Sequence, residues 1–351
     1  MADKRIGVGI SGLGRSGWGI HVRTLQRSVV SGEFRVVAVT DPLTERAMEG
    51  RDLLGCRACA SFEEMIADPE VELVVVASPS LDHVPQAVAA MRAGKDVLCE
   101  KPMTTNLADA DRLLAVAAET GRVLTVNQHM RYFPDTRQVQ EVLRSGKLGD
   151  LLQIRLAVHQ FGRRWDWQTL KEFGGGMLNN WGAHMVDLAL LLLGDVDPEV
   201  FCDMRSTPLF CGGDAEDQVK IILRAPGRPL VDIEMTQAYA YGQERWQIMG
   251  TQGSLTGSNK QIRWKYFDPR VAEPRPLSKE PTPDRSYNRD TLPWREETWD
   301  NSEDVTSGYE LLYQDLYETL VHGAPLAITA ESVRRQIAVL EECRRQSAIY
   351  A

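Results

Sequence analysis

Residues 5–17 read RIGVGISGLGRSG. A short apolar run rich in Val and Ile ends in three glycines, Gly12, Gly14 and Gly17, which are spaced as G-x-G-x-x-G. The run predicts a strand that is buried on both faces, and the glycines predict a tight turn into a helix. In a dinucleotide-binding turn, the first glycine permits the turn, the second lets a pyrophosphate approach the backbone, and the third lets the helix pack on the strand. An ordinary glycine turn is the alternative.

Asp41 supports the dinucleotide interpretation. It ends the next strand-like run, Phe34–Thr40, and a carboxylate at this place accepts hydrogen bonds from the adenosine ribose. It favours NAD, because it would repel a 2′-phosphate, although Arg46 is near enough in sequence to keep NADP open. The start of the helix would offer N–H groups to the pyrophosphate. The residues that we expect to hold the cofactor here are Gly12, Gly14, Arg15, Ser16, Gly17 and Asp41.

The first third of the chain alternates between strand and helix patterns. Helical spacing over His83–Ala93 and Leu107–Thr120 ends each time at a glycine. Such alternation predicts βαβ units and a parallel sheet, so residues 1–127 are expected to form an α/β Rossmann domain. The predicted strands are Arg5–Ser11, Phe34–Thr40, Glu72–Ser78, Asp96–Glu100 and Arg122–Asn127.

After residue 127 the pattern changes to longer, alternating segments. These predict an α+β domain over residues 128–351 with a large, mainly antiparallel, open-faced sheet. The predicted strands are Leu151–Gln160, Val219–Arg224, Leu230–Tyr239, Arg245–Gly250 and Gln261–Phe267, and the predicted helices are Asp135–Ser145, Tyr309–Val321 and Glu331–Ala348.

Residues 268–300 are rich in proline and charge. Because proline removes a backbone donor, this segment predicts a long excursion and not a strand. It is expected to be either a solvated or subunit-contacting loop, or a lid or binding arm.

The composition narrows the class of protein. A chain of 351 residues with 43% hydrophobic and 25% charged residues is typical of two soluble globular domains. The net charge of −9 disfavours nucleic acid as the main partner. The N-terminus lacks a signal-peptide pattern and no apolar run is long enough to span a bilayer, so we expect a cytoplasmic protein without a membrane partner. The six cysteines are expected to be reduced, and we expect no metal site, although Cys56 and Cys59 form one C-x-x-C pair.

Glu100-Lys101-Pro102 directly follows the predicted strand at 96–100. In open parallel sheets, ligands bind at the carboxyl ends of the strands. Lys101 is therefore expected to face the cofactor crevice.

Residues 174–187 read GGGMLNNWGAHMVD. The glycines would let the chain turn sharply into a helix, and Asn180 and His184 would share one face of it. An alcohol loses a hydride only as its hydroxyl proton is removed, and an imidazole with an ordinary pKa of about 6.5 is a natural acceptor. A nearby Lys101 ammonium would lower that pKa, keep the histidine neutral and stabilise the developing alkoxide. Trp165, Trp167 and Trp181 are either sugar-packing faces or core residues.

Together these stretches resemble the glucose–fructose oxidoreductase/inositol dehydrogenase/rhizopine-catabolism (Gfo/Idh/MocA) family over almost the whole chain. The resemblance adds VVVASPSLDHVPQAVAAMRAGKDVLCEKP, VNQHMRYFP and MGTQGSLTG to the motifs above. It implies that Lys101 and His184 act in catalysis and that His83 shapes the cofactor pocket. The position of Asn180 is commonly an aspartate in this family, so a carboxylate is missing here. Cofactor contacts are also implied for Ser78, Pro79, His83, Glu100 and Lys101, and substrate contacts for Lys101, Arg131, Trp165, Asn180 and His184.

The resulting expectation is an NAD(P)-dependent oxidoreductase that acts on a sugar, polyol or sugar-derivative hydroxyl. The partner would be a small carbohydrate or polyol, and the resemblance implies a homodimer or homotetramer. Two alternatives stay open. One is redox-assisted glycosidic-bond cleavage with NAD recycled in place, and the other is a non-catalytic cofactor-binding protein.

Overall fold

The N-terminal part of the protein folds around a parallel sheet. The computed structural model describes residues 4–289, 291–304 and 307–350. Six parallel strands lie in the order β3-β2-β1-β4-β5-β6. This order confirms the predicted Rossmann-type α/β fold. The strands are β1 (Ile6–Ser11), β2 (Phe34–Thr40), β3 (Arg57–Ala58), β4 (Leu73–Val76), β5 (Asp96–Cys99) and β6 (Leu124–Val126), and the helices are α1 (Arg23–Leu25), α2 (Ser28–Ser31), α3 (Thr44–Leu54), α4 (Phe62–Ala67), α5 (His83–Arg92) and α6 (Leu107–Thr120).

Local sequence accounts for these elements. β1 and β4 are buried along their whole length, as expected of strands covered on both faces. Helix α6 begins after Asn106, whose side chain accepts a hydrogen bond from the backbone N–H of Asp109, and it ends at Gly121 with φ 63°. These bounds are the ones that the sequence predicts. The two-residue β3 was missed because it is too short to show a pattern.

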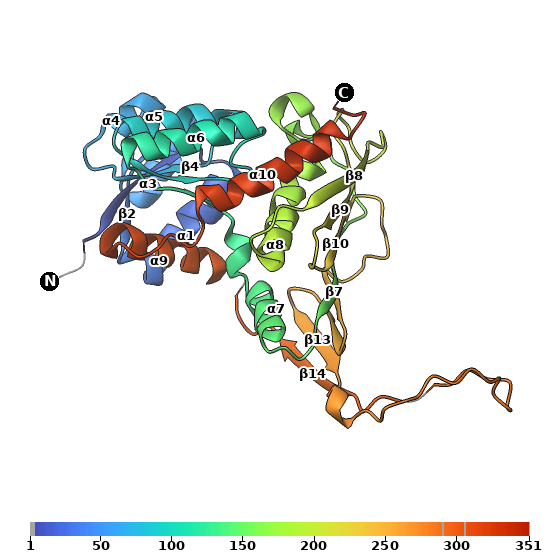
Figure 1. Cartoon of the computed structure of the whole chain (residues 1–351). Helices are drawn as coiled ribbons and strands as arrows, with labels where there is room; N and C mark the ends of the chain where they lie inside the picture. Colours follow the sequence, from blue (N-terminus) through green and yellow to red (C-terminus); the bar gives the residue numbers. More distant parts are fainter. Residues whose placement is uncertain (1–3, 290, 305–306, 351) are drawn as a thin grey trace.

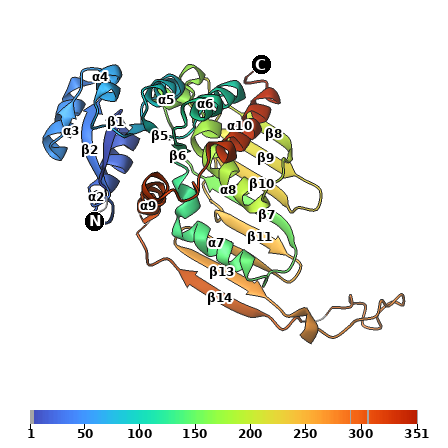
Figure 2. The ribbon, with the colours of Figure 1, turned by 60° about the vertical axis from the view of Figure 1, so that its left-hand side comes forward.

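The second sheet has eight strands in the order β14-β13-β12-β11-β7-β10-β9-β8. All neighbours are antiparallel except the parallel pair β7 and β10, which confirms the mainly antiparallel prediction. Helices α7, α8 and α10 lie on one face of it (Figure 2). The strands are β7 (Leu151–His159), β8 (Glu199–Arg205), β9 (Gln218–Arg224), β10 (Leu230–Thr236), β11 (Trp246–Gly250), β12 (Gly253–Gly257), β13 (Gln261–Tyr266) and β14 (Arg295–Asp300), and the helices are α7 (Pro134–Arg144), α8 (Ala183–Leu193), α9 (Ser307–His322) and α10 (Ala330–Arg345).

Short helical turns complete the chain. Two are π-helical, η1 (Gly17–Val22) and η6 (Leu178–Gly182), and each runs directly into an α-helix. The others are 3₁₀ turns, η2 (Ser80–Asp82), η3 (His129–Tyr132), η4 (Trp167–Thr169), η5 (Lys171–Phe173) and η7 (Pro269–Val271). Within residues 4–289, 291–304 and 307–350, no helix is both long enough and apolar enough to cross a bilayer.

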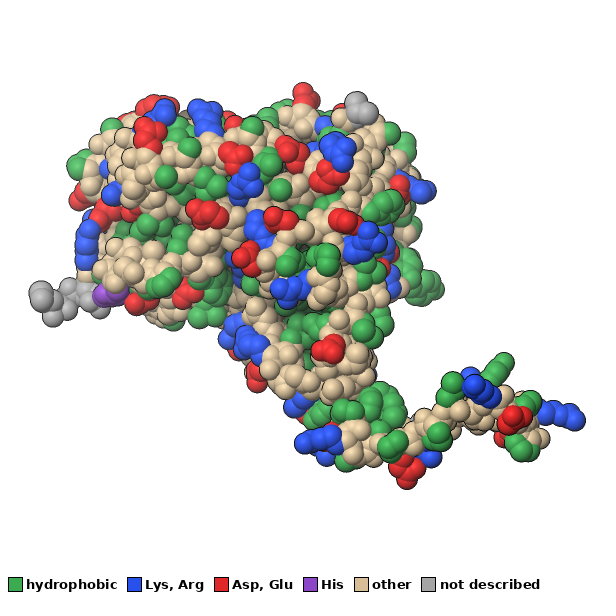
Figure 3. All heavy atoms as spheres, viewed as in Figure 1, with side chains coloured by type: hydrophobic (Ala, Val, Ile, Leu, Met, Phe, Trp, Pro, Cys, Tyr) green, Lys and Arg blue, Asp and Glu red, His purple; other side chains and the backbone are tan. Residues whose placement is uncertain are grey.

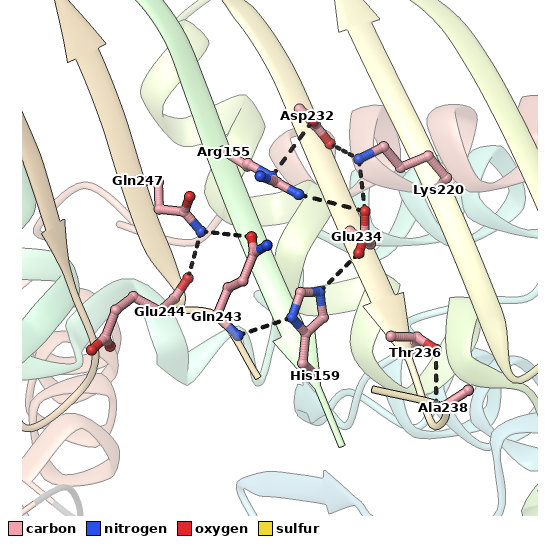
Figure 4. A network of polar contacts seen from close by, with 10 residues as sticks. All are labelled: Arg155, His159, Lys220, Asp232, Glu234, Thr236, Ala238, Gln243, Glu244 and Gln247. Carbon is pink, nitrogen blue, oxygen red and sulfur yellow. Dashed lines mark hydrogen bonds and ion pairs between the residues drawn. The ribbon is translucent and has the colours of Figure 1, made fainter. Parts of the chain in front are cut away.

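The face of the second sheet that is turned away from the helices is charged. Figure 4 shows Glu234 of β10 bound by Lys220 Nζ at 2.9 Å, by His159 Nε2 at 3.1 Å and by Arg155 Nη2 at 3.6 Å. Asp232, two residues earlier on the same strand, also contacts Lys220 and Arg155. The alternate residues of β10, Val231, Ile233 and Met235, are apolar and buried. One face of the strand therefore builds the core while the other carries an ion-pair network.

The segment between β13 and β14 projects from the body as an arm (Figure 3). Its apolar side chains stay exposed, with Leu277 at 88% and Tyr287 at 81% exposure. The predicted excursion over residues 268–300 is wrong at its end, because residues 295–300 form β14 and pair with β13. The sequence REETWD has too few apolar residues to signal a strand, since β14 lies at the edge of the sheet.

The C-terminal helices do not belong to the second domain alone. Tyr313 and Leu316 of α9, and Val333 and Ile337 of α10, lie in the core cluster of the N-terminal domain. Leu340, farther along α10, lies in the core cluster of the second sheet. Strands β1–β6 lie before residue 128 and strands β7–β14 after it, while α9 and the first half of α10 return to the first core (Figure 1).

This return predicts the effect of a core substitution. Leu316 is 2% exposed, so Leu316→Ala should lower the free energy of unfolding by about 2–5 kcal/mol, through lost burial and a cavity. Leu277→Ala, the same change on the exposed arm, should alter it by less than about 0.5 kcal/mol. Urea unfolding of both variants checks this, and an equal effect of the two substitutions would contradict the placement of α9.

Candidate active site

A cleft of about 1280 Å³ lies between the two domains and is lined by residues from both. From the first domain it receives the turns that follow β1, β2, β4 and β5, which is where a parallel sheet binds ligands. From the second it receives residues of η3, the start of α8 and the segment that follows β7. Of the residues predicted to contact the cofactor, those that line the cleft are Gly12, Gly14, Arg15, Ser16, Asp41, Ser78, Pro79, His83, Glu100 and Lys101.

The three glycines of the glycine-rich turn have two different surroundings. Gly12 and Gly17 are packed closely against other backbone atoms, whereas Gly14 has open space beside it. A Cβ on Gly12, whose φ is +90°, would lie 2.6 Å from the carbonyl oxygen of Ala77, and a Cβ on Gly17 would lie 1.8 Å from that of Gly12. A Cβ on Gly14 would meet only Arg46 Nη1, at 3.9 Å. Gly17 therefore packs beneath the turn and does not line the cleft. Gly14 leaves its backbone open to a phosphate group, so the turn fits a dinucleotide.

Asp41 stands at the rim of this turn, fixed by the backbone. Its Oδ2 accepts a hydrogen bond from the N–H of Leu13 at 2.7 Å, and its Oδ1 accepts one from the N–H of Leu43 at 2.8 Å. Each carboxylate oxygen keeps a further lone pair for ribose hydroxyls. Arg46, the cation that kept NADP as a possible cofactor in the sequence-based prediction, also lines the cleft near this turn.

Glu100 is a buried carboxylate that organises the end of β5. Its Oε1 accepts hydrogen bonds from Asn127 Nδ2 at 2.7 Å and from His21 Nε2 at 3.1 Å, and its Oε2 accepts the N–H of Lys101 at 3.0 Å. His21 Nδ1 in turn lies 2.8 Å from the hydroxyl of Tyr313. Burial would raise the pKa of Glu100, but the hydrogen bond and charge of His21, followed by the Lys101 ammonium, outweigh it and hold that pKa well below its usual range.

Lys101 crosses from the first domain to the second. Its Nζ donates to the carbonyl oxygen of Asn180 at 3.1 Å and to Asn180 Oδ1 at 3.4 Å. Burial is the main cause that lowers the pKa of Lys101 to about 8, with the charges of Arg15 and Arg164 acting in the same direction against that of Glu100. Lys101, which follows β5, and Asn180, which precedes α8, are thus in contact.

His184 lines the same cleft at the start of α8, where it is 6% exposed. Its Nδ1 lies 3.2 Å from Gln128 Oε1. Burial lowers the pKa of His184 well below its ordinary value, and the charge of Lys101 is the next cause. The lowered pKa favours the neutral imidazole, which is the form that can accept a proton. Asn180 and His184 both face the cleft, although η6 is a π-helical turn and not the regular helix that we expected.

Two further histidines border the site. His83 lies between the carbonyl oxygens of Pro102, at 2.8 Å, and Ser78, at 3.0 Å, so it joins two cofactor-side turns. His129 also lines the cleft, with its ring centroid 5.1 Å from that of His184. Burial lowers the pKa of His129 to about 4, so it too is neutral.

The structure does not support the expected substrate contact of Arg131. Its Nε and Nη2 donate to the two carboxylate oxygens of Asp187 at 2.8 and 2.6 Å, and Nη2 also reaches Ser332 Oγ at 3.1 Å. Arg131 is absent from the described lining of the cleft. A bidentate pair with a buried carboxylate uses this guanidinium to join α8 and α10 to η3.

Trp165 is likewise outside the described lining and is 78% exposed. Trp167 and Trp181 line the cleft instead, with the Trp181 ring centroid 6.4 Å from that of His184. The chain changes direction between them, because Asp166 is the N-cap of η4 and Trp167 is its first residue. Of the three tryptophans considered from sequence, these two remain as aromatic faces for a ligand.

Several lining residues were not predicted. Most of them lie in irregular segments or short turns of the second domain, where no periodicity marks them: Phe133, Gln160, Arg164, Gln168, Gln237 and Arg245. Tyr309 lies in α9, and its place in the cleft was not predicted. Gln128 is not part of the described lining, but it follows β6 and its Oε1 lies 3.2 Å from His184 Nδ1.

Two family models match this chain. The model described as "Oxidoreductase family, NAD-binding Rossmann fold" matches residues 6–128, and the "GFO/IDH/MocA C-terminal domain" matches residues 136–256. Among curated relatives, 1,5-anhydro-D-fructose reductase of Ensifer adhaerens is 30% identical over 69% of this chain and 75% of its own. Inositol 2-dehydrogenase 2 of Saccharopolyspora erythraea is 32% identical over 71% of this chain and 72% of its own.

Solved structures share the fold. An oxidoreductase of Thermotoga maritima superposes with a TM-score of 0.79 at 20% identity, covering 97% of this chain and 96% of that one. The WlbA dehydrogenase of Bordetella pertussis, solved with NADH and UDP-GlcNAcA, gives a TM-score of 0.76 at 21% identity, covering 98% and 96%. With both domains matched and the cleft between them described, the chain belongs to the GFO/IDH/MocA family and is an NAD(P)-dependent oxidoreductase.

Proposed function

We propose that this protein transfers a hydride between a nicotinamide cofactor and a hydroxyl carbon of a sugar, polyol or sugar derivative, with Lys101 and His184 as the polar and acid–base pair. The observation that carries the proposal is the meeting of two residues from different domains in one cleft. Lys101 Nζ contacts Asn180 at 3.1 Å, one helical turn before His184, and both Lys101 and His184 line the cleft. Relatives named inositol 2-dehydrogenase and 1,5-anhydro-D-fructose reductase support the substrate class.

In this mechanism each residue has one task. When bound, the nicotinamide ring accepts or returns the hydride. The neutral His184 takes the hydroxyl proton during oxidation and returns it during reduction. The Lys101 ammonium donates a hydrogen bond to the same oxygen and stabilises the negative charge that develops on it. The turn at Gly14 and the carboxylate of Asp41 would hold the pyrophosphate and the adenosine ribose.

Polar amides and aromatic faces around the pair fit a polyhydroxylated substrate. Gln160, Gln237 and Trp181 line the part of the cleft that the second domain contributes. Amides both donate and accept hydrogen bonds, as hydroxyl groups require. We also expect a homodimer or homotetramer, supported by the helix-free face of the second sheet, where Phe201 is 60% exposed.

The proposal predicts the effect of two alanine variants. Lys101→Ala and His184→Ala should each lower kcat/KM by about 10²–10⁴-fold, because positioned acid–base groups contribute about that much. NAD affinity should change little, since the glycine-rich turn remains intact. NADH formation should be measured with a panel of polyols, aldoses, anhydrosugars and glycosides.

Matched controls are Lys265→Ala and His159→Ala, which lie on the second sheet outside the cleft. Both should retain wild-type rates. Near-wild-type turnover in both cleft variants would overturn the proposed pair. Bond cleavage without net NADH formation would favour the glycosidic alternative, and tight NAD binding with no turnover at all would favour the non-catalytic one.

The pH profile of oxidation follows from the two pKa shifts. The pKa of Lys101 is lowered to about 8, so the ammonium is present below that pH and is lost as the pH rises through it. The pKa of His184 lies well below its ordinary value, so the neutral base is already present at pH 6.5. We expect kcat/KM to be level near neutral pH and to fall above about pH 8. A profile level up to the ordinary lysine pKa of about 10.4 would contradict this role of Lys101.

Asp41 predicts the cofactor preference. Because its carboxylate would repel a 2′-phosphate, NAD should bind at least about 10-fold more tightly than NADP, equivalent to ~1.4 kcal/mol. Asp41→Asn should narrow that ratio by removing the charge. Asp82→Asn, which removes another carboxylate that lines the cleft, should leave it unchanged. Fluorescence titration with both nucleotides tests this, and an unchanged ratio in Asp41→Asn would show that Asp41 does not select the cofactor.

A further inference from the structure

We propose that Gln128 is the positioning residue that holds His184 as its Nδ1–H tautomer, so that Nε2 is the nitrogen that exchanges the substrate proton. This inference deepens the proposed function and rests on it. It concerns a residue that the sequence analysis did not single out.

The polarity of the Gln128 amide follows from its second contact. Gln128 is fully buried. Its Nε2 donates to the carbonyl oxygen of Ala183 at 3.1 Å, the residue before His184. A carbonyl can only accept, so the NH₂ end of the amide must point to Ala183, and the oxygen end, Oε1, points to His184.

The tautomer of His184 then follows. Gln128 Oε1 is an acceptor and lies 3.2 Å from His184 Nδ1, so Nδ1 must carry the hydrogen. A neutral imidazole has one N–H, and burial together with Lys101 keeps this one neutral. Nε2 is thus left with a free lone pair on a residue that lines the cleft, which is what a base for a hydroxyl proton requires.

Asn180 is turned to a different partner. Although it lies four residues before His184, its Oδ1 and backbone oxygen both accept hydrogen bonds from Lys101 Nζ. Orientation of the histidine and of the lysine is thereby divided between two amides, Gln128 for His184 and Asn180 for Lys101.

The charged groups around His184 explain why a neutral amide, Gln128, and not a carboxylate suits its Nδ1. Three cations lie near the imidazole: Lys101 after β5, Arg15 before η1 and Arg245 before β11. Each of them disfavours protonation of His184 and so lowers its pKa. His129 on η3, itself neutral, is the remaining titratable group whose interaction with His184 lowers its pKa. A carboxylate at position 128 would add the opposite charge directly at Nδ1. It would keep the acceptor but make His184 more basic.

The direct test is the nitrogen shift of the His184 ring. Only six histidines are present, so ¹⁵N-histidine labelling with His184→Ala for assignment resolves this ring. Wild-type protein at pH 7.5 should show the Nδ1–H pattern, with Nε2 unprotonated. Gln128→Leu, which lacks the acceptor, should lose that pattern in favour of Nε2–H or a mixture. An Nε2–H ring in the wild type, or no change in Gln128→Leu, would overturn the proposal.

Kinetics with a second variant separates positioning from stability. Gln128→Leu should lower kcat by about 10–100-fold, as for other residues that orient a functional histidine, with the affinity for NAD unchanged. Gln128→Glu keeps the acceptor, so its turnover should exceed that of Gln128→Leu at a pH just below the Lys101 pKa of about 8, while the acid limb of kcat/KM moves to higher pH. A purely structural role of Gln128 would lower stability and move no limb, and that result would also refute the proposal.

The chain offers a matched control in Gln336, another fully buried glutamine, which lies on α10 outside the cleft. Gln336→Leu should leave both the His184 ring shifts and the pH profile as in the wild type. The ring shifts need no turnover, so they test the tautomer even if no carbohydrate is oxidised. A blank substrate panel with the expected shifts would count against the proposed function alone.

Discussion

The geometry of the cleft depends on one buried carboxylate. Glu100 is only 4% exposed, so its charge is tolerated because hydrogen bonds from Asn127, His21 and the N–H of Lys101 satisfy it. Those donors come from the ends of two neighbouring strands and from the turn into the first helix. Through His21 the same network reaches Tyr313 on α9. The direction of the Lys101 side chain is therefore determined by contacts that span the first domain.

The regular strands and helices of the first domain could be predicted from the sequence. Buried parallel strands leave Val-rich runs, and capped helices leave a side chain such as Asn106 and a terminal Gly121, so the first sheet was predicted nearly strand for strand. Residues tied to the strand ends, such as Lys101 and Asp41, followed from the same rule. The edge strand β14 could not be predicted, because its exposed face and poor apolar content give no signal.

It was harder to predict from the sequence which residues each polar or aromatic side chain would contact. Arg131 and Trp165 have suitable chemistry for a sugar site, but the first is held by Asp187 and the second is directed outward. Neither outcome is encoded in local spacing, since each depends on a contact with a distant segment. The same limit applies to Gln128, whose contacts with Ala183 and His184 join segments that are 55 and 56 residues apart in the sequence. Two π-helical turns, η1 before α1 and η6 before α8, also carry residues of the cleft. Such turns are frequent at functional sites, but the pattern of apolar residues does not reveal them.

Helix α10 has a mechanical consequence for the cleft. Its first half packs in the core of the nucleotide domain and its second half in the core of the sheet domain, while Arg344 near its end donates to the carbonyl oxygen of Thr105 at 2.8 Å. This continuous helix thus connects the two domains (Figure 1). Wide hinge opening would tear one of its ends from a core. Ligands would then enter through rearrangement of loops and side chains at the rim of the cleft. For the same reason, the two domains are expected to unfold cooperatively.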